Sequence, residues 1–311
     1  MKIENNNSIA VGRFAPTPSG RLHAGNILCA LLSYLSAVSK GGKYIVRIED
    51  TDVIRCPRSV ALSMLDTLDK FGLGSQEKEV WQSERSAVYE AKERELARKV
   101  KIYPCFCSRA ELHAEVAPRL SDGSIVYAGT CRNLSADEVQ KLSAKRKPCY
   151  RVAVPNEVIK FTDGVAGEYS QNLADECGDF IIRRSDGVYA YQFAVSCDDG
   201  ESGVTEVVRG NDLISSTPRQ IWLMQLLGYK PPKYYHIPLV CDHTGRKLSK
   251  SEGDDITGKL QTRTPEQILG ALAYAARIID EERPASLDEL VPLFSWDKIP
   301  RDKILLPPSL Q

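Results

Sequence analysis

The hydrophobic residues near the start of the chain change their spacing from one segment to the next. Residues 8–14 form a short apolar run, and residues 25–39 carry apolar side chains every three or four positions, as in a helix buried on one face. Apolar and polar residues alternate in residues 43–50, and residues 57–71 return to helical spacing. The order strand, helix, strand, helix predicts an α/β fold with a doubly wound parallel sheet.

The strand predicted at residues 43–50 has two chemically different faces. A period of two residues puts Arg47 and Glu49 on the same face. The opposite, apolar face would carry Tyr44, Val46 and Ile48. We interpret Arg47 and Asp50 as a structural ion pair rather than as part of a binding site.

The pattern changes after the charged helix predicted at residues 89–100. Residues 103–185 contain clustered cysteines and short strand-like runs such as CYRVAV and DFIIRR. This change in the sequence pattern indicates an α+β insertion in the main fold.

The α/β pattern resumes after the insertion. Residues 188–196 and 205–210 are typical of strands, and helical spacing is found at residues 217–227 and 265–279. We therefore expect four parts along the chain: the first half of a catalytic domain (1–102), the insertion (103–185), the second half of the catalytic domain (186–244) and a short helical C-terminal region (245–311).

Composition and charge narrow the class of protein. The 311 residues include 41 basic and 41 acidic side chains, and the hydrophobic fraction of 42% and charged fraction of 26% are those of a soluble globular protein. With no net charge, an RNA-binding surface would be local rather than spread over the molecule. No signal peptide is recognisable, and the longest apolar stretch, residues 27–38, is too short to span a bilayer. We expect a cytoplasmic monomer that does not bind membranes.

One segment between a predicted strand and a predicted helix has the chemistry of a phosphate-binding loop. In APTPSGRLHAGN, proline and glycine let the backbone approach a ligand, and the helix start offers unpaired N–H groups to an anion. His23 stands just before the helix and could reach the same anion, although a histidine in this position is also typical of helix capping. This segment alone does not decide between the two roles.

A second segment strengthens the phosphate-binding interpretation. GRKLSKSEGD, residues 245–254, puts Lys247 and Lys250 in a short Gly/Ser-rich loop. The flexible lysine ammonium is a mobile point charge suited to a polyphosphate. A solvated basic loop is the simpler alternative, but both segments occur in this order at edges of the predicted sheet, so coincidence is a poor explanation.

These segments resemble the two signatures of the class I aminoacyl-tRNA synthetases. RLHAGN is similar to their H-I-G-H signature and KLSKS to K-M-S-K-S, with Asn26 and Leu248 as departures. FAPTPSG, VRIEDTD, VTEVVRGNDL and TPRQIWLMQLLG are similar to the glutamyl branch, and the resemblance covers most of residues 11–253. The residues after the lysine loop are too few for the helical anticodon-binding region of a glutamyl-tRNA synthetase. This combination resembles the paralogous family of glutamyl-queuosine tRNA(Asp) synthetases.

The resemblance implies a fold and an activity. The fold would be the Rossmann-type catalytic domain of class I synthetases with an inserted zinc-containing α+β subdomain. The activity would be a tRNA-independent reaction of L-glutamate with ATP, accompanied by Mg²⁺, to glutamyl-adenylate and pyrophosphate. Glutamate would then pass to the queuosine base at the anticodon wobble position of tRNA(Asp). No protein nucleophile is required, so catalysis would consist of positioning and stabilisation of phosphate charge.

The residues themselves fit a glutamate pocket. Bound glutamate has two carboxylates and one ammonium group, which suit Arg13 and Arg209 as carboxylate partners and Glu49 as the ammonium partner. Tyr191 could donate a hydroxyl hydrogen bond, although core packing is the usual role of such a tyrosine. By resemblance, the glutamate-binding residues are Arg13, Phe14, Ala15, Pro16, Thr17, Glu49, Tyr191 and Arg209. By resemblance, the ATP-binding residues are His23, Gly25, Asn26, Lys247 and Lys250, of which His23, Lys247 and Lys250 are catalytic.

Three of the nine cysteines are clustered in the insertion. Cys105, Cys107 and Cys131 could supply three ligands of a tetrahedral zinc site, and three free thiols are the alternative. The resemblance supplies Tyr127 as the fourth ligand, whereas His113 is the chemically ordinary choice. We interpret the other six as small buried hydrophobes: Cys29, Cys56, Cys149, Cys177, Cys197 and Cys241.

Other functions stay open at this level. A short glutamyl-tRNA synthetase that charges the 3′ end of tRNA(Glu) would share the whole glutamate and ATP site. A catalytically inactive RNA-binding paralogue and a nucleotidyltransferase with a similar first signature are further alternatives. Basic residues of the insertion could contact RNA phosphates or form an ordinary solvated face: Arg132, Lys141, Lys145, Arg146 and Lys147.

Overall fold

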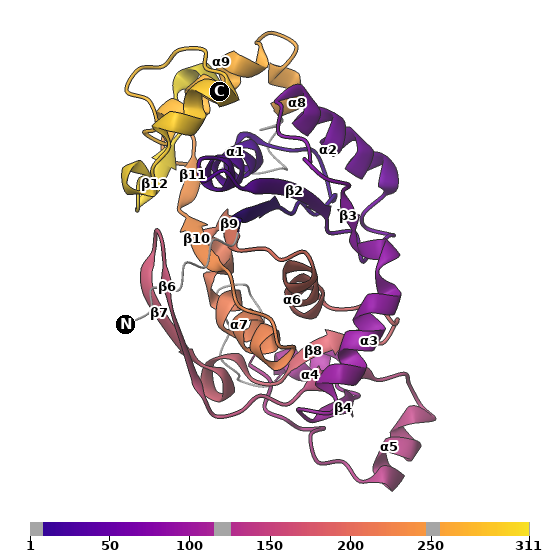
Figure 1. Ribbon diagram of the computed structural model, residues 1–311. Coiled ribbons are helices and arrows are strands. Elements are labelled where there is room, and N and C mark those ends of the chain that lie inside the picture. Colours follow the sequence, from indigo (N-terminus) through magenta and orange to yellow (C-terminus); the bar gives the residue numbers. More distant parts are fainter. Residues whose placement is uncertain (1–8, 115–125, 247–255, 311) are drawn as a thin grey trace.

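The computed structural model describes residues 9–114, 126–246 and 256–310 (Figure 1). Its centre is a parallel sheet of five strands: β1 (Val11–Phe14), β2 (Lys43–Ile48), β3 (Val80–Trp81), β9 (Glu206–Gly210) and β10 (Lys233–Ile237). Their order across the sheet is β10-β9-β1-β2-β3. The chain builds outward from β1 in one direction and then returns to its other side with β9. This reversal opens a crevice at the carboxyl ends of β1 and β9, where parallel α/β sheets bind ligands.

Helices cover both faces of this sheet. One face packs against α1 (Ala24–Val38), α2 (Arg58–Lys70) and α9 (Pro265–Ala275), and the other against α3 (Ser86–Leu96), α6 (Tyr191–Glu201) and α7 (Thr217–Leu226). Strand β2 contributes to both cores, since Ile45 lies in the core under α6 and its neighbours lie in the core under α1. Those neighbours are Tyr44, Val46 and Ile48. The predicted α/β fold with a parallel sheet is confirmed, and so are the two faces of this strand.

The segment predicted as a strand at residues 188–196 instead contains the beginning of α6. Its aromatic and β-branched residues are typical of a strand, but the helix is buried on nearly every side. Such a helix shows no single apolar stripe, since even Asp198 and Asp199 are buried in it. The prediction was wrong because periodicity cannot distinguish a short, fully buried helix from a strand.

Two other predicted helices have different ends in the structure. The helix predicted at residues 89–100 is α3, which begins and ends a few residues earlier. The helix predicted at residues 265–279 is α9, which ends at Ala275. Arg277 then adopts the left-handed conformation, with φ of 59°, and turns the chain away from the helix axis.

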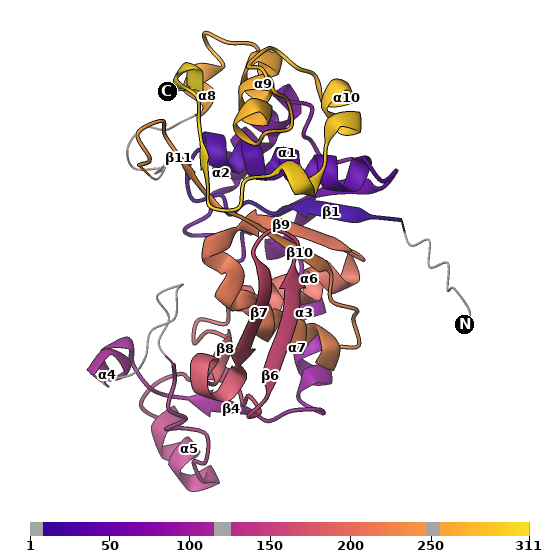
Figure 2. The same cartoon turned by 90° about the vertical axis from the view of Figure 1, so that its left-hand side faces the viewer.

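The insertion forms two small antiparallel β-structures. Strands β4 (Ile102–Cys105), β5 (Cys149–Val152) and β8 (Phe180–Arg183) form one sheet, and β6 (Val158–Asp163) and β7 (Gly167–Asn172) form a hairpin. Its described residues also form the α-helices α4 (Arg109–Ala114) and α5 (Ala136–Ser143). Figure 2 shows the hairpin running from this small sheet towards β9 and β10 of the central sheet. The runs CYRVAV and DFIIRR are strands, as predicted.

The C-terminal region packs on the α1 side of the sheet (Figure 1). The ring of Trp296 stacks on Tyr235 with centroids 4.1 Å apart, and its indole N–H donates to the Ser36 hydroxyl oxygen at 3.0 Å. The other α-helices and strands of the described residues are β11 (Leu239–Cys241), α8 (Ile256–Lys259), α10 (Leu287–Leu290) and β12 (Lys303–Leu305). Strands β11 and β12 pair in parallel outside the central sheet. Within the described part of the chain, no helix has both the length and the apolar character needed to cross a membrane.

A buried carboxylate on α6 joins three segments of the fold. Asp198 is fully buried and accepts hydrogen bonds from Gln82 Nε2 at 2.7 Å, Arg85 Nε at 2.6 Å and the Tyr89 hydroxyl at 2.8 Å. These charged and polar partners offset the desolvation of the carboxylate. Asp198 thereby ties α3 and the turn before it to α6.

Replacing Asp198 with alanine should lower the free energy of unfolding by about 3–5 kcal/mol, because a largely buried arginine loses its counter-charge. Urea denaturation followed by circular dichroism measures this change. The control is Glu90→Ala, which removes an exposed pair with Arg94 on α3 and should cost less than about 1 kcal/mol. Equal losses in the two variants would contradict the role given to Asp198.

Candidate active site

Two cavities adjoin at the carboxyl ends of β1 and β9. The first, of about 330 Å³, is lined by residues that include Pro16, His23, Gly25 and Asn26. The second, of about 310 Å³, is lined by residues that include Arg13, Glu49, Tyr191 and Arg209. Five residues line both cavities: Phe14, Ala15, Thr17, Cys29 and Leu213. A ligand in the first cavity would therefore touch a ligand in the second.

A larger cavity lies at the opposite edge of the sheet. It has a volume of about 760 Å³ and is lined by residues at the amino ends of β9 and β10, with Lys40 and Lys230 at its wall. It contains none of the predicted site residues. We assign the site to the carboxyl edge because the predicted phosphate-binding and carboxylate-binding side chains converge there.

His23 caps α1 and also lines the first cavity. Its Nδ1 accepts a hydrogen bond from the Asn26 backbone N–H at 3.2 Å, and the Asn26 amide oxygen accepts one from the His23 N–H at 3.0 Å. Because Nδ1 is an acceptor, the neutral ring carries its proton on Nε2. The capping interpretation of His23 is confirmed, and the capping bond orients a ring that lines the first cavity. The amide oxygen of Asn26 belongs to the cap.

Gly25 allows this close approach of the ring to the backbone. A Cβ atom at position 25 would lie 3.1 Å from both Cε1 and Nδ1 of His23. Alanine at this position would push the ring of His23 by a few tenths of an ångström.

The two predicted catalytic lysines, Lys247 and Lys250, lie outside the described residues. The turn before them is held by Asp242, whose carboxylate accepts hydrogen bonds from Thr244 and Arg246. The Thr244 hydroxyl and the Arg246 donors lower the pKa of Asp242 to about 2. Strand β11, directly before this turn, lines the first cavity. The described chain that leads to the lysine loop therefore passes the first cavity at Leu239 and Val240.

The predicted glutamate-binding residues come together in the second cavity. Arg13 and Arg209 reach it from β1 and β9, Glu49 from the end of β2, and Tyr191 from the first turn of α6. Burial raises the pKa of Tyr191, and the negative charge of Glu49 adds to the effect, so the phenol is a donor at neutral pH. Of the predicted residues, Pro16 lines only the first cavity.

Asp199 balances the charge beneath this cavity. It accepts hydrogen bonds from Arg47 at 2.5 Å and from Nε of Arg13 at 3.4 Å, and Arg47 also donates to Glu49 at 3.3 Å. All four side chains are less than one-tenth exposed. Burial raises the pKa of Glu49, while Arg47 and Arg13 oppose that effect. The two arginines are thus held in place by acidic side chains before any ligand is present.

The predicted ion pair between Arg47 and Asp50 is wrong. Arg47 pairs with Asp199 and Glu49, while the Asp50 carboxylate accepts hydrogen bonds from the backbone N–H and the hydroxyl of Ser83. The physical reason is that Arg47 points under the sheet towards α6. Its main partner, Asp199, lies just beyond the segment predicted as a strand, on the helix α6 that the sequence did not predict.

The guanidinium of Arg209 is held at two of its three nitrogens. Its Nε donates to His236 Nε2 at 3.0 Å and one terminal nitrogen donates to the Thr217 hydroxyl at 2.8 Å. On the other side of the ring, His236 Nδ1 lies 2.6 Å from the Asp163 carboxylate. Burial lowers the pKa of His236 to about 4 against the opposing effect of Asp163, so the imidazole is neutral.

Sequence reasoning missed several residues of the site. His236 and Asp163 stand in different predicted segments, and no spacing rule joins them. Asn211 and Asp212 line the first cavity directly after β9. Asp199 had a weak signal, since it and Asp198 directly follow the run FAVSC, and acidic residues are buried only when they are paired.

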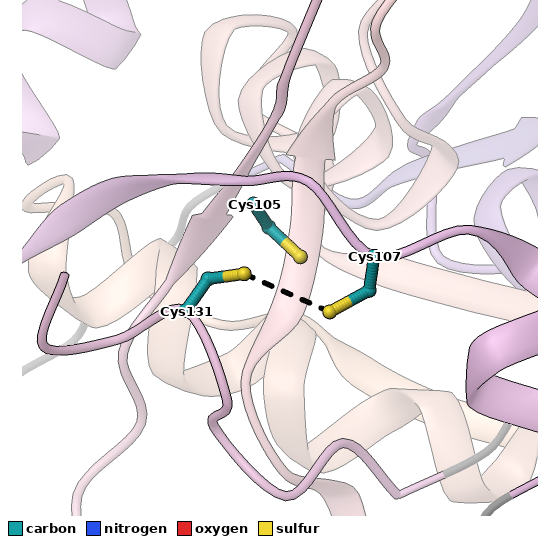
Figure 3. Close-up of side chains that lie close together, drawn as sticks. All are labelled: Cys105, Cys107 and Cys131. Atoms are coloured by element: carbon teal, nitrogen blue, oxygen red, sulfur yellow. Dashed lines mark hydrogen bonds between the residues drawn. The ribbon is translucent and has the colours of Figure 1, made fainter. Parts of the chain in front are cut away.

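Three thiols lie close together in the insertion (Figure 3). The sulfur atoms of Cys105, Cys107 and Cys131 are within 4.8 Å of one another, and those of Cys107 and Cys131 are 3.6 Å apart. The hydroxyl oxygen of Tyr127 lies 3.5 Å from the sulfurs of Cys105 and Cys107. Three sulfurs and one oxygen in this arrangement could hold a metal ion that prefers thiolate ligands. The side chain of His113 lies outside the described residues.

Hydrogen-bond donors and one cation surround this cluster. The Cys131 backbone N–H donates to the Tyr127 oxygen at 2.7 Å, and Arg151 Nε donates to the Cys105 sulfur at 3.3 Å. The guanidinium of Arg151 also lies 3.9 Å from the centroid of the Tyr127 ring. Donors and cations in such positions stabilise anionic ligand atoms.

Two of the six cysteines predicted as buried hydrophobes have other surroundings. Cys149 is half-buried and lies opposite Cys105 in the β4–β5 pair, where its thiol donates to the backbone carbonyl oxygen of Cys105 at 3.4 Å and lowers the pKa of the Cys105 thiol. Cys29 is half-buried and lines both cavities, and burial raises the pKa of its thiol to about 11. The prediction holds for the buried remainder: Cys56, Cys177, Cys197 and Cys241.

The basic residues of the insertion divide into two kinds. Arg132 donates two hydrogen bonds, at 2.6 and 2.5 Å, to the buried carboxylate of Asp179, so its first role is structural. Arg146 pairs with the exposed Glu111 at 3.1 Å. The three lysines are exposed: Lys141, Lys145 and Lys147.

The chain matches known proteins over most of its length. Residues 10–268 match the family model described as tRNA synthetases class I (E and Q), catalytic domain. A Neisseria meningitidis serogroup A protein named glutamyl-Q tRNA(Asp) synthetase is 41% identical over 300 residues, which cover 95% of this chain and 99% of the relative. The chain belongs to the glutamyl-Q tRNA(Asp) synthetase family. A relative of the same name from Symbiobacterium thermophilum is 40% identical over 309 residues, which cover 95% of each chain.

A solved structure extends the match to three dimensions. The crystal structure of a glutamate tRNA ligase from Elizabethkingia meningosepticum, in complex with its amino acid, superposes with a TM-score of 0.83 at 26% identity. The match covers 97% of this chain and 68% of that one. As a member of the glutamyl-Q tRNA(Asp) synthetase family, the chain is a ligase of the class I aminoacyl-tRNA synthetase type. The family implies ATP, glutamate and a tRNA as partners.

Replacing Gly25 with alanine should raise the dissociation constant of ATP about tenfold, because the added methyl group displaces the His23 ring that faces the first cavity. Isothermal titration calorimetry with ATP measures this constant. The control is Gly258→Ala in α8, where nothing lies within 4 Å of the added Cβ atom. An unchanged affinity in Gly25→Ala would show that the position of the His23 ring does not matter for the nucleotide.

Proposed function

We propose that the chain forms glutamyl-adenylate from L-glutamate and ATP without a tRNA and then transfers glutamate to queuosine in tRNA(Asp). The observation that carries this proposal is the charge pattern of the second cavity, whose wall contains Arg13, Arg209 and Glu49. Glutamate carries the complementary charges: its two carboxylates match the two arginines, and its ammonium group matches Glu49. Glutamine would leave one arginine without a charged partner, so the wall favours the acid over its amide.

The first step joins the contents of the two cavities. An oxygen of the glutamate α-carboxylate attacks the α-phosphorus of ATP, the bond from that phosphorus to the bridging oxygen breaks, and pyrophosphate leaves. Nε2–H of His23 and the N-terminus of α1, at Gly25 and Asn26, would bind phosphate oxygens. Lys247 and Lys250 would neutralise the charge of the leaving pyrophosphate. Mg²⁺ bound with ATP would supply additional positive charge at the phosphates.

The amino acid would be fixed by the residues of the second cavity. Arg13 and Arg209 would bind carboxylates, Glu49 would accept hydrogen bonds from the ammonium group, and Tyr191 would donate its hydroxyl proton to a carboxylate oxygen. The remaining predicted contacts would come from the segment directly after Arg13. Three of its residues line both cavities and Pro16 lines only the first: Phe14, Ala15, Pro16 and Thr17.

The second step transfers the activated glutamate. A hydroxyl oxygen of queuosine attacks the acyl carbon of glutamyl-adenylate, an ester bond forms, AMP leaves, and the hydroxyl proton is released. Support for this acceptor comes from the relatives, since proteins named glutamyl-Q tRNA(Asp) synthetase match this chain almost end to end. The chain spans a smaller share, 68%, of the glutamate tRNA ligase structure.

We further propose that residues 103–185 form a zinc-containing subdomain between the two halves of the catalytic domain (1–102 and 186–244), with residues 245–311 as a C-terminal region. The zinc ligands would be Cys105, Cys107, Tyr127 and Cys131. The donor set fits this metal, because zinc accepts tetrahedral sites dominated by thiolates. The bound ion would stabilise the fold of this subdomain rather than take part in the reaction.

The zinc proposal predicts one tightly bound zinc ion per chain and a specific effect of Tyr127→Phe. The variant keeps the ring under Arg151 but removes the oxygen, so the affinity for zinc should fall by about 10- to 100-fold. Competition with a chromophoric chelator measures this affinity. The control is Tyr150→Phe, whose ring lies under Arg183 instead. Unchanged affinity in Tyr127→Phe together with loss in Cys149→Ser would assign the fourth ligand to Cys149.

The function itself is tested by a transfer assay with radiolabelled glutamate, ATP and Mg²⁺. Queuosine-containing tRNA(Asp), tRNA(Asp) without queuosine and tRNA(Glu) are offered separately. Label should appear on queuosine-containing tRNA(Asp) alone. In parallel, His23→Ala should lower glutamate-dependent pyrophosphate exchange by about 100-fold or more, because a donor to the phosphates is lost.

The other outcomes of this assay identify the alternatives. Label on tRNA(Glu) would mean that the chain is a short charging enzyme. No label and no pyrophosphate exchange would contradict an enzymatic role and favour an RNA-binding one. Unchanged exchange in His23→Ala would contradict the role given to that residue.

A further inference from the structure

The orientation of Arg209 depends on residues outside the cavity wall. Its side chain is 5% exposed, and the terminal nitrogen NH1 has no partner among the described residues, although Arg209 lines the second cavity. The other two nitrogens are fixed by His236 and Thr217. A buried guanidinium N–H group without a partner is costly unless a ligand completes its hydrogen bonding. The fixed pair of bonds therefore leaves NH1 for a ligand in the cavity.

The two bonds of His236 require one tautomer of its ring. The carboxylate of Asp163 only accepts hydrogen bonds, so Nδ1, at 2.6 Å from it, carries the proton. Arginine only donates, so Nε2 must offer its lone pair to Nε of Arg209. The hydroxyl of Thr217, at 3.2 Å, lies beside the same nitrogen. If Nε2 carried the proton instead, its N–H group would face the N–H group of Arg209 Nε, and the hydrogen bond that holds Arg209 would be lost.

Asp163 is itself held firmly by the tip of the β6–β7 hairpin. Its carboxylate is buried and accepts hydrogen bonds from the backbone N–H groups of Val165 and Ala166 at 2.9 Å, and from the His236 backbone N–H at 3.1 Å. The hairpin packs closely on β10 at this point, since a Cβ atom on Gly164 would lie 2.2 Å from the ring of Tyr235. The turn of the insertion is therefore seated on the central sheet, directly behind the glutamate cavity.

We propose that Asp163 and His236 are positioning residues that hold Arg209 with NH1 presented to a carboxylate of the amino-acid substrate. The β6–β7 hairpin of the insertion thereby takes part in the selection of an acidic amino acid. The identity of that substrate rests on the proposed function, whereas the tautomer and the hydrogen-bonded chain do not. Asp163 and His236 act through Arg209 and do not touch the substrate.

The test uses Asp163→Asn in the full-length protein. Asparagine keeps an oxygen for the N–H groups of Val165 and Ala166, but its amide NH₂ would donate to Nδ1 and move the ring proton to Nε2. The KM for glutamate in pyrophosphate exchange should rise about 10- to 100-fold, while the KM for ATP stays within about twofold of wild type. The preference for glutamate over glutamine should fall by a similar factor.

Two further variants separate positioning from a merely structural role. His236→Gln supplies an amide oxygen in place of the Nε2 acceptor, so its KM for glutamate should rise less than that of Asp163→Asn. Lys160→Ala changes an exposed residue of the same hairpin and should leave both KM values unchanged. Parallel increases in the KM for glutamate and for ATP in Asp163→Asn, or a larger increase in His236→Gln, would overturn the proposal.

Nitrogen-15 NMR of labelled histidine tests the chain of bonds independently of catalysis. The ring of His236 should be neutral with the proton on Nδ1 in the wild type and on Nε2 in Asp163→Asn. Wild-type protein with the proton on Nε2 would overturn the proposal. If wild-type protein does not activate glutamate, the proposed function fails, and the NMR result still decides whether Asp163 and His236 set the orientation of Arg209.

Discussion

The burial of charge on α6 is the constraint on which the rest of the structure depends. Asp198 and Asp199 are adjacent, both are buried, and neither is tolerable without cationic or polar partners. Asp198 takes its partners from α3 and the turn before it, and Asp199 takes Arg13 and Arg47 from the central sheet. Only one position of α6 relative to α3 and the sheet lets both aspartates reach their partners. The floor of the second cavity is therefore held in place without a ligand, and such preorganisation is what a reaction that relies on positioning requires.

The sequence was most informative where local chemistry and periodicity coincide. The alternation in β2 and the apolar stripe of α1 predicted the central βαβ unit, and the two signature segments predicted a site at the edge of the sheet. Arg13, Glu49, Tyr191 and Arg209 do meet in one cavity. Two of the failures share a physical cause, which is burial. A helix surrounded by protein loses its polar face, so α6 was mistaken for a strand, and the partner of Arg47 was hidden within it. His236 and Asp163 could not be paired from the sequence because only the folded hairpin brings them together.

The insertion contributes to the molecule at both of its ends. Near α5 it carries the thiol cluster, where Arg151 contacts both the Cys105 sulfur and the Tyr127 ring. At the other end, the hairpin tip delivers Asp163 to β10. The small antiparallel sheet joins these two ends, and Arg151 on β5 also donates to the backbone carbonyl of Asp179, directly before β8. Asp163 of the hairpin is thus tied, through His236 and Arg209, to the back of the second cavity.

The pairing of β12 with β11 has a consequence for the biosynthesis of the molecule. Leu239 and Val240 of β11 line the first cavity, and their strand partner is formed by residues 303–305. The ribosome makes these residues long after it has made the rest of the cavity wall. A nascent chain can therefore fold its central sheet and bury the charges of α6 while this wall is still unsupported. The first cavity gains the support of β12 only when translation has passed residue 305.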